Sequence, residues 1–160
     1  MINEIIIRIY EPGDPSLVSH LHMKLYEQQY GFKGIFEHYV MKGMAEFLIN
    51  PAASQMWVAV DDDTVVGSIA IVKIGEDLAQ LRWFIVDTPA QGKGIGTALM
   101  DTAMQFCADN RYNRIYLWTA GNLDAARHLY KKYGFMLTET KENTEWTDNL
   151  VTEEKWECNT

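Results

Sequence analysis

The residues best suited to bind a charged ligand form the run Gln91-Gly92-Lys93-Gly94-Ile95-Gly96. Glycines at alternate positions let the backbone approach a ligand closely, because no Cβ stands in the way. The apolar spacing of the residues that follow predicts that a helix begins inside this run. Free amide N–H groups at a helix start favour an anion. The run therefore predicts a pyrophosphate site, where Lys93 either pairs with a phosphate or lies in solvent.

Two common nucleotide-binding patterns do not fit this run. The P-loop needs four residues between its first glycine and Gly-Lys-[Ser/Thr], a spacing that residues 91–96 lack. The dinucleotide-binding fingerprint is GxGxxG near the first strand. Here the spacing is GxGxG after about the fourth predicted strand. We therefore expect neither a P-loop nor a Rossmann nucleotide site.

A second stretch completes a resemblance to a known family. Residues 91–96 match the [Arg/Gln]-x-x-Gly-x-[Gly/Ala] signature of the GNAT N-acetyltransferases, and residues 126–135 resemble that family's second signature, Ala-x-x-Leu-Tyr-x-x-x-Gly-Phe. A short predicted strand separates the two. The resemblance covers nearly the whole chain and implies transfer of an acetyl group from acetyl-CoA to an amine.

A narrower likeness concerns residues 25–31, 81–86 and 117–119. These segments resemble the acetyltransferase half of bacterial proteins that join a MarR-type regulator to such a domain, and we expect only the catalytic half here. One position departs from the family pattern. Where many members carry Asn, three residues before the alanine of the second signature, this chain has Leu123, with Asn122 one residue earlier.

The resemblance assigns cofactor contacts to three parts of the chain, within residues 84–86, 91–97 and 122–130. It implies that the backbone of a central strand holds the pantetheine arm, and that an amide there stabilises the developing oxyanion. The side chains of that strand are expected in the core. Arg127 is expected to meet a phosphate or carboxylate, or to lie in solvent. The residues assigned to acetyl-CoA are Phe84, Ile85, Val86, Gln91, Gly92, Lys93, Gly94, Ile95, Gly96, Thr97, Asn122, Arg127 and Tyr130.

The reaction needs a proton donor and a proton acceptor. Tyr130 is the predicted acid, because a phenol with a reference pKa of about 10 is protonated at neutral pH and can return a proton to a leaving thiolate. The alternative is a buried packing tyrosine. Glu27 is the predicted base for the amine, Asp87 is the second choice, and His20 and His22 are further candidates.

The predicted acceptor pocket is aromatic, with one carboxylate. Its assigned residues are Tyr26, Glu27, Tyr30 and Trp118, and Trp83 and Trp146 are further candidates for its walls. Aromatic faces attract a cation, which suits a small amine; plain core packing is the alternative for each ring. A protein lysine or N-terminus remains open as the acceptor, as does a non-catalytic module that binds or senses acetyl-CoA.

The elements that must position these residues follow from periodicity and from glycine or proline breaks. Asp14 is the predicted cap of the first helix. Residues 81–86 are apolar on both faces, which indicates a central strand. We predict one α/β domain over residues 1–160, with a mixed, mostly antiparallel sheet of six or seven strands and about four helices. The predicted strands are 5–10, 57–60, 65–72, 81–86, 115–118, 135–140 and 150–156, and the predicted helices are 14–30, 36–48, 95–106 and 123–133.

The composition of the chain excludes several classes of binding partner and of site. The formal net charge of −8 disfavours nucleic acid and anionic membranes as partners. Cys107 and Cys158 lie far apart and form no CxxC or Cys/His cluster, so neither a disulfide framework nor a metal site is expected. No apolar run approaches the length of a membrane span, and no signal-peptide design is present. We expect a cytoplasmic protein and leave a homodimer open.

Overall fold

The computed structural model describes residues 4–120 and 124–160. It confirms the predicted class, a mixed sheet with helices on both faces. Within the described residues, no helix is long and apolar enough to cross a membrane. In chain order the elements are β1 (Ile5–Ile9), α1 (Asp14–Tyr30), α2 (Gly34–Ile49), β2 (Gln55–Asp61), β3 (Thr64–Lys73), β4 (Leu78–Val86), the short 3-10 helix η1 (Thr88–Ala90), α3 (Ile95–Asp109), β5 (Arg114–Ala120), α4 (Asp124–Lys132), β6 (Met136–Asn143) and β7 (Val151–Asn159).

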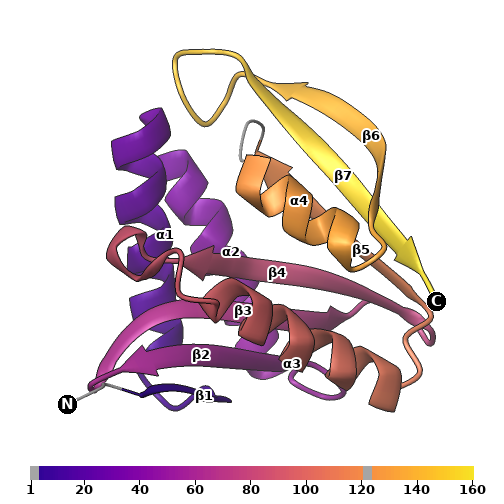
Figure 1. Ribbon diagram of the computed structural model, residues 1–160. Helices are drawn as coiled ribbons and strands as arrows, with labels where there is room; N and C mark the ends of the chain where they lie inside the picture. Colours follow the sequence, from indigo (N-terminus) through magenta and orange to yellow (C-terminus); the bar gives the residue numbers. More distant parts are fainter. Residues whose placement is uncertain (1–3, 121–123) are drawn as a thin grey trace.

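The sheet has the strand order β1-β2-β3-β4-β5-β7-β6. Every neighbouring pair is antiparallel except β4 and β5, which α3 connects as a parallel crossover. In Figure 1, α3 and α4 lie in front of the sheet, and α1 and α2 lie behind it. β4 is the fourth of seven strands, which confirms the central strand predicted from its sequence.

Side chains of the central strands pack into the core on both faces of the sheet. In β3, Ile69 and Ile71 face α3 and join a cluster around Leu99, whereas Ala70 belongs to a second cluster with Val18 and other residues under α1 and α2. Successive side chains of a strand point to opposite faces, so a strand buried on both faces reads as a continuous apolar run. β3 therefore carries apolar residues at the consecutive positions Ile69, Ala70 and Ile71.

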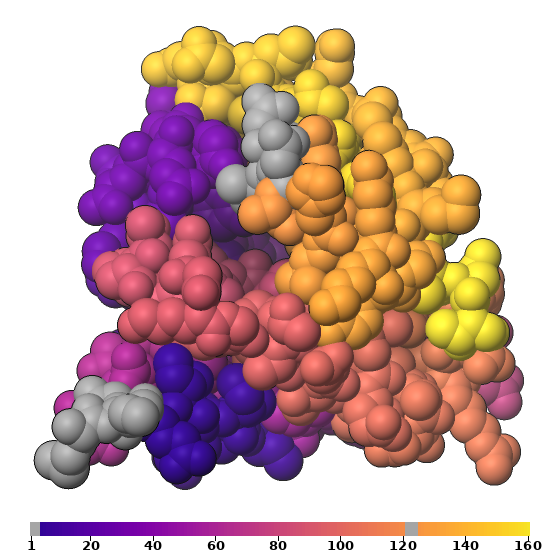
Figure 2. Space-filling model, viewed as in Figure 1, coloured from indigo at the N-terminus to yellow at the C-terminus, as the bar shows by residue number. Residues whose placement is uncertain are grey.

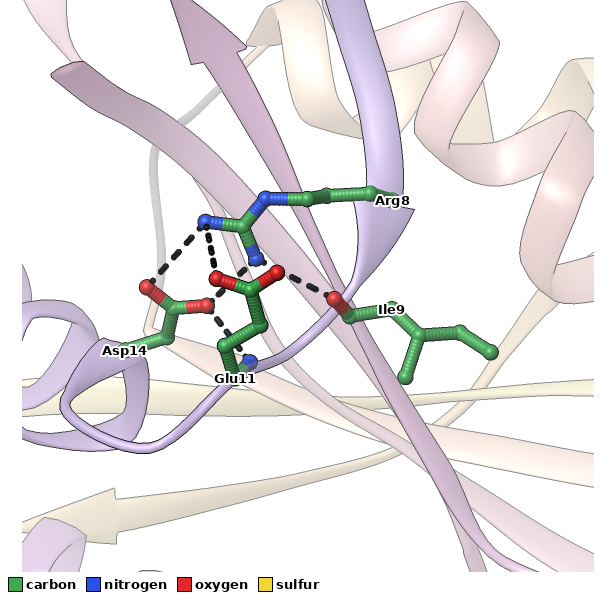
Figure 3. Close-up of polar contacts among 4 residues, drawn as sticks. All are labelled: Arg8, Ile9, Glu11 and Asp14. Carbon is green, nitrogen blue, oxygen red and sulfur yellow. Dashed lines mark hydrogen bonds and ion pairs between the residues drawn. The ribbon is translucent and has the colours of Figure 1, made fainter. Parts of the chain in front are cut away.

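The corner between β1 and α1 is closed by an ion pair (Figure 3). Arg8 Nη1 lies 2.6 Å from Asp14 Oδ2, and the same carboxylate accepts a hydrogen bond from the Glu11 backbone N–H at 2.7 Å. The prediction that Asp14 caps the helix was wrong by one residue. Gly13, with φ of 98°, is the cap, and Asp14 is the first helical residue. Its buried carboxylate fastens the preceding turn instead.

The sheet opens at its centre. The parallel register of β4 and β5 covers only Leu78 to Gln80 on β4, opposite Arg114 to Tyr116 on β5. Beyond that point a bulge shifts the register of β4 against β3, and Trp83 adopts a positive φ of 48°. Bulges bend a strand and increase its twist. The C-terminal half of β4 therefore turns away from β5 and leaves one edge of its backbone without a strand partner.

Candidate functional site

A cavity of about 680 Å³ occupies the opening between β4 and β5. Figure 2 shows three of the segments that line it meeting on one side of the molecule: α1 in purple, the loop before α3 in rose, and α4 in orange. α2, β4, β5, β7 and the loop between β6 and β7 supply the rest of the lining. The cavity therefore joins the glycine-rich run to the aromatic residues of the first two helices.

One end of the cavity is the start of α3. Gly92 and Gly94 have φ of 79° and 80°, a region that side chains disfavour, and a Cβ built on either meets nothing within 4 Å. The helix has no side-chain cap, so its first amides keep their hydrogen-bonding capacity. Gln91 Nε2 donates to the Val86 carbonyl at 3.0 Å and fixes the loop to the end of β4. This end fits a pyrophosphate.

The floor of the cavity is the bulged half of β4. Phe84 packs toward α3 and α4, where it lies 3.5 Å from a Cβ built on Gly96, while Ile85 packs with Leu21 and Leu25 of α1. Ser68 fixes the bulge, because its hydroxyl donates to the Trp83 carbonyl at 2.6 Å. The unpaired backbone edge of β4 can accept an extended amide-bearing chain as an added strand.

Tyr130 of α4 reaches the middle of the cavity. Only 5% of the residue is exposed, and its ring lies 6.0–6.3 Å from the rings of Phe84, Phe135 and Trp156. Burial raises the pKa of Tyr130 well above its usual value, the neighbouring Tyr26 raises it further, and a hydrogen bond from Thr119 acts in the opposite direction. The phenol therefore keeps its proton across the physiological range.

The other end of the cavity is aromatic. The Tyr26 ring stacks on Phe32 and lies 6.1 Å from the His22 ring, and burial raises the pKa of Tyr26 to about 12. Trp146, from the loop between β6 and β7, packs edge-on against Phe36 at 5.1 Å. Its carbonyl accepts a hydrogen bond from the Lys33 backbone N–H at 2.7 Å. The loop is thereby held over the connection between α1 and α2.

A carboxyl group reaches this end from β7. Glu153 lines the cavity and is 6% exposed. Its Oε2 accepts a hydrogen bond from Asn143 at 3.2 Å and lies 3.8 Å from Lys141 Nζ. Lys141 in turn lies over the Trp118 ring at 4.4 Å. Among the described residues no hydrogen bond involves Oε1, so this oxygen can accept one from a ligand.

Comparison with known proteins identifies the family. The profile of the Acetyltransferase (GNAT) family matches residues 17–135, which is most of the chain. The chain belongs to the GNAT family of acetyltransferases. Human N-acetylaspartate synthetase is 34% identical over 99 residues, covering 61% of this chain and 33% of the synthetase. This chain thus spans about a third of the length of that relative.

Solved structures agree on the GNAT fold. A GNAT acetyltransferase from Staphylococcus aureus Mu50 superimposes with a TM-score of 0.80 at 18% identity, covering 98% of this chain and 99% of the other. The yncA protein of Salmonella typhimurium, solved with its cofactor acetyl-CoA, gives 0.76 at 12% identity, with coverage of 98% and 94%.

The structure brings together most of the residues predicted for this GNAT site. Lys93 is exposed and does not line the cavity. Asn122 lies outside the described residues. The predicted residues that line the cavity are Tyr26, Phe84, Ile85, Val86, Gln91, Gly92, Gly94, Ile95, Gly96, Thr97, Trp118 and Tyr130, together with the further candidates His22, Trp83 and Trp146.

Arg127 forms an ion pair with Glu154 and does not line the cavity. Its Nη2 lies 2.5 Å from Glu154 Oε2 and its Nε 3.0 Å from Glu154 Oε1. Arg–carboxylate pairs of this two-point kind are geometrically specific. The pair fastens α4 to β7, so the geometry favours a role for Arg127 in positioning the helix that carries Tyr130.

Three of the four predicted bases lie outside the cavity lining. Glu27 is exposed on α1, and neither Glu27 nor Tyr30 lines the cavity. The Asp87 carboxylate accepts from the Thr88 backbone N–H at 2.9 Å and also lies outside the lining, as does His20. His22 lines the cavity, but burial lowers its pKa to about 4. Glu153 is the carboxyl group that sequence reasoning missed.

Proposed function

We propose that this chain transfers an acetyl group from acetyl-CoA to a primary amine, that of a small molecule, by direct attack in a ternary complex. The single observation that supports this best is the continuity of the cavity. The amides at the start of α3, the buried phenol of Tyr130 and the carboxyl group of Glu153 all border the same space. A phosphate-binding end, a proton donor and a proton acceptor are the parts that such a transfer requires.

The residues would divide the work as follows. The amides from Gln91 to Thr97 bind the pyrophosphate, and the backbone of Phe84 to Val86 holds the pantetheine arm. Acetyl-CoA, when bound, supplies the thioester carbonyl that the amine attacks. The new N–C bond forms as the C–S bond breaks. An acceptor that arrives as an ammonium ion first releases one proton to solvent. The neutral amine then attacks, Glu153 takes the proton that the nitrogen loses and the leaving thiolate takes the proton of Tyr130. Proton exchange with solvent restores the Glu153 carboxylate and the Tyr130 phenol.

A small acceptor is favoured by the walls of the aromatic end. The loop between β6 and β7 is fastened to the first helices by the Lys33–Trp146 backbone hydrogen bond and by the Tyr39–Glu145 hydrogen bond of 2.8 Å. These hydrogen bonds hold the loop so that packed aromatic rings enclose the acceptor end of the cavity. An enclosed end suits a compact amine better than an extended peptide. The narrower likeness to MarR fusion proteins stays a prediction from sequence.

The proposal is tested by an acceptor screen with acetyl-CoA and a free-thiol readout. The panel includes polyamines, aromatic amines, amino acids and lysine-containing peptides. Thiol release that requires both the enzyme and a small amine supports the proposal. If lysine peptides alone are acetylated, the acceptor class is wrong. If acetyl-CoA binds tightly and the whole panel stays unreacted, a sensing role replaces the enzyme.

A further inference from the structure

Arg82 is a cation inside the acceptor end of the cavity. It lies on β4, it is half-buried, and it borders the same cavity as Glu153. Its Nε donates to Gln80 Oε1 at 2.7 Å, and the Tyr116 hydroxyl donates to the same oxygen at 3.4 Å. Gln80 therefore holds one edge of the guanidinium, and the two terminal nitrogens form no hydrogen bond with residues 4–120 or 124–160.

Arg82 differs from three of the other four arginines in its partners; the fourth, Arg111, is exposed to solvent. Arg8, Arg114 and Arg127 each lie within 2.9 Å of a carboxylate oxygen. No carboxylate among the described residues forms an ion pair with Arg82. Burial lowers the pKa of its guanidinium, while Tyr116 and, more weakly, the exposed Glu46 of α2 act in the opposite direction. Charges removed from water are normally paired, so this half-buried guanidinium, with no ion pair among the described residues, can receive a carboxylate from a ligand.

The surrounding packing holds the guanidinium in place. Its central carbon lies 5.8 Å from the centre of the Trp83 ring. Gly43, in the interior of α2, lets this pair approach the helix, because a Cβ there would lie 3.2 Å from Trp83 and 3.8 Å from Arg82 Nη1. A glycine inside a helix costs up to about 1 kcal/mol relative to alanine. The helix thus carries a less favourable residue where it faces Arg82 and Trp83.

We propose that Arg82 binds a carboxylate of the acceptor, so that the acceptors of this chain are amines that also carry a carboxyl group, as amino acids do. The inference rests on the proposed function. The planar guanidinium offers a fork of N–H donors that matches a carboxylate with two parallel hydrogen bonds. Glu153, on another wall of the same cavity, attracts the amino group. The two walls thus match a zwitterion by charge.

The test uses matched probes that differ only at the carboxyl group. L-Leucine, L-methionine and L-phenylalanine are compared with their α-carboxamides, and L-aspartate and L-glutamate with their diamides, in wild type, Arg82→Gln and Arg82→Lys. Arg114→Gln is the matched control, because it removes the same charge from the far end of β5, where Arg114 pairs with Asp77. Two readouts are taken: kcat/KM for acetylation, and the melting temperature with each probe in the presence of CoA.

We expect wild type to prefer at least one acid over its amide by about thirtyfold in kcat/KM, a preference on the order of a charge-assisted hydrogen-bonded pair. Arg82→Gln should bring that ratio toward one, mainly through KM, while Arg82→Lys keeps part of it and Arg114→Gln keeps all of it. If an acid raises the melting temperature of wild type but not that of Arg82→Gln, and is not acetylated, Arg82 binds the carboxylate. That result supports this inference and overturns the proposed acetyl transfer.

Two results overturn the inference. If acids and amides are acetylated equally, or if only amines without a carboxyl group react, the transfer stands and the role of Arg82 is wrong. If no acid is acetylated and none raises the melting temperature of wild type above that of Arg82→Gln, Arg82 does not bind the acceptor carboxylate.

Discussion

The hydroxyl of Ser68 donates to the carbonyl oxygen of Trp83 over 2.6 Å, at the point where β4 bulges away from its neighbours. Ser68 is fully buried, so the Trp83 carbonyl has a fixed partner inside the sheet. The bond therefore stabilises the bend that separates β4 from β5. The cavity depends on that separation, since both strands supply its lining.

Replacing Ser68 by alanine leaves the Trp83 carbonyl without this donor. We expect a loss of about 1–2 kcal/mol in the free energy of unfolding, and a weaker affinity for acetyl-CoA, measured by urea denaturation and calorimetric titration. Ser54→Ala is the matched control, because its buried hydroxyl accepts from the Lys73 backbone N–H outside the cavity. An equal loss of affinity in both variants would mean that the bulge has no special role.

Gly94→Asp should abolish the rise in melting temperature that acetyl-CoA causes in wild type. The substitution places a negative charge where a phosphate is expected, and ligand stabilisation follows affinity by mass action. Gly94→Asn is the control, since asparagine has nearly the same shape and tolerates the positive φ. We expect Asn to keep part of the shift. If Asp keeps the full shift, the phosphates bind elsewhere.

Tyr130→Phe should lower turnover about tenfold or more and leave acetyl-CoA affinity near normal, because it removes a proton donor and keeps the ring. Tyr112→Phe is the control; its buried hydroxyl donates to the Ala53 carbonyl, outside the cavity. Pre-steady-state rates and equilibrium binding separate the two effects. Unchanged turnover in Tyr130→Phe would assign protonation of the thiolate to water.

His22 should make the fold sensitive to acid. Its Nδ1 lies 2.8 Å from the Val18 carbonyl and its folded-state pKa is lowered to about 4. The unfolded chain binds the proton first, so this contribution to stability is full above about pH 6.5 and is lost as the pH falls toward 4. The loss is on the order of 3 kcal/mol. His22→Gln should show a correspondingly flatter dependence of unfolding free energy on pH, and an identical slope would contradict the lowered pKa.

Glu153→Gln should lower kcat at least tenfold, because it removes the proposed acceptor of the amine proton. Asparagine and lysine neighbours hold the side chain, so the amide can keep the packing. Glu27→Gln tests the assignment made from sequence, with kcat measured for both variants. If Glu27→Gln lowers kcat tenfold and Glu153→Gln does not, the base is on α1.

The features that sequence alone predicts are local ones. The glycine-rich run, the helix after it and the second signature each lie within one short stretch, where glycine conformation and apolar spacing decide the structure. The sequence does not predict Glu153 and Arg82 as site residues, because their positions depend on the register in which the strands pair. Glu153 faces the cavity only because β7 pairs with β5 so that Glu153 lies opposite Ala120, and such long-range pairing has no local signal.

Helix rotation explains the difference at Glu27. Leu21 and Leu25 are buried against the sheet and Tyr26 is half-buried, so the next residue is turned about 100° further around α1. The periodicity of the apolar residues predicts this face correctly. Which polar residue beside it reaches the cavity depends on how α1 packs on β4 and on the loop that carries Trp146.

The most direct test of the account follows free CoA and N-acetylated product together in one reaction, by thiol titration and mass spectrometry, with wild type, Tyr130→Phe and Gly94→Asp. The account predicts equal amounts of CoA and N-acetylated small amine from wild type, slower formation of both by Tyr130→Phe, and neither from Gly94→Asp. Free CoA formed without any acetylated amine, or product formed equally fast by Gly94→Asp, would contradict it.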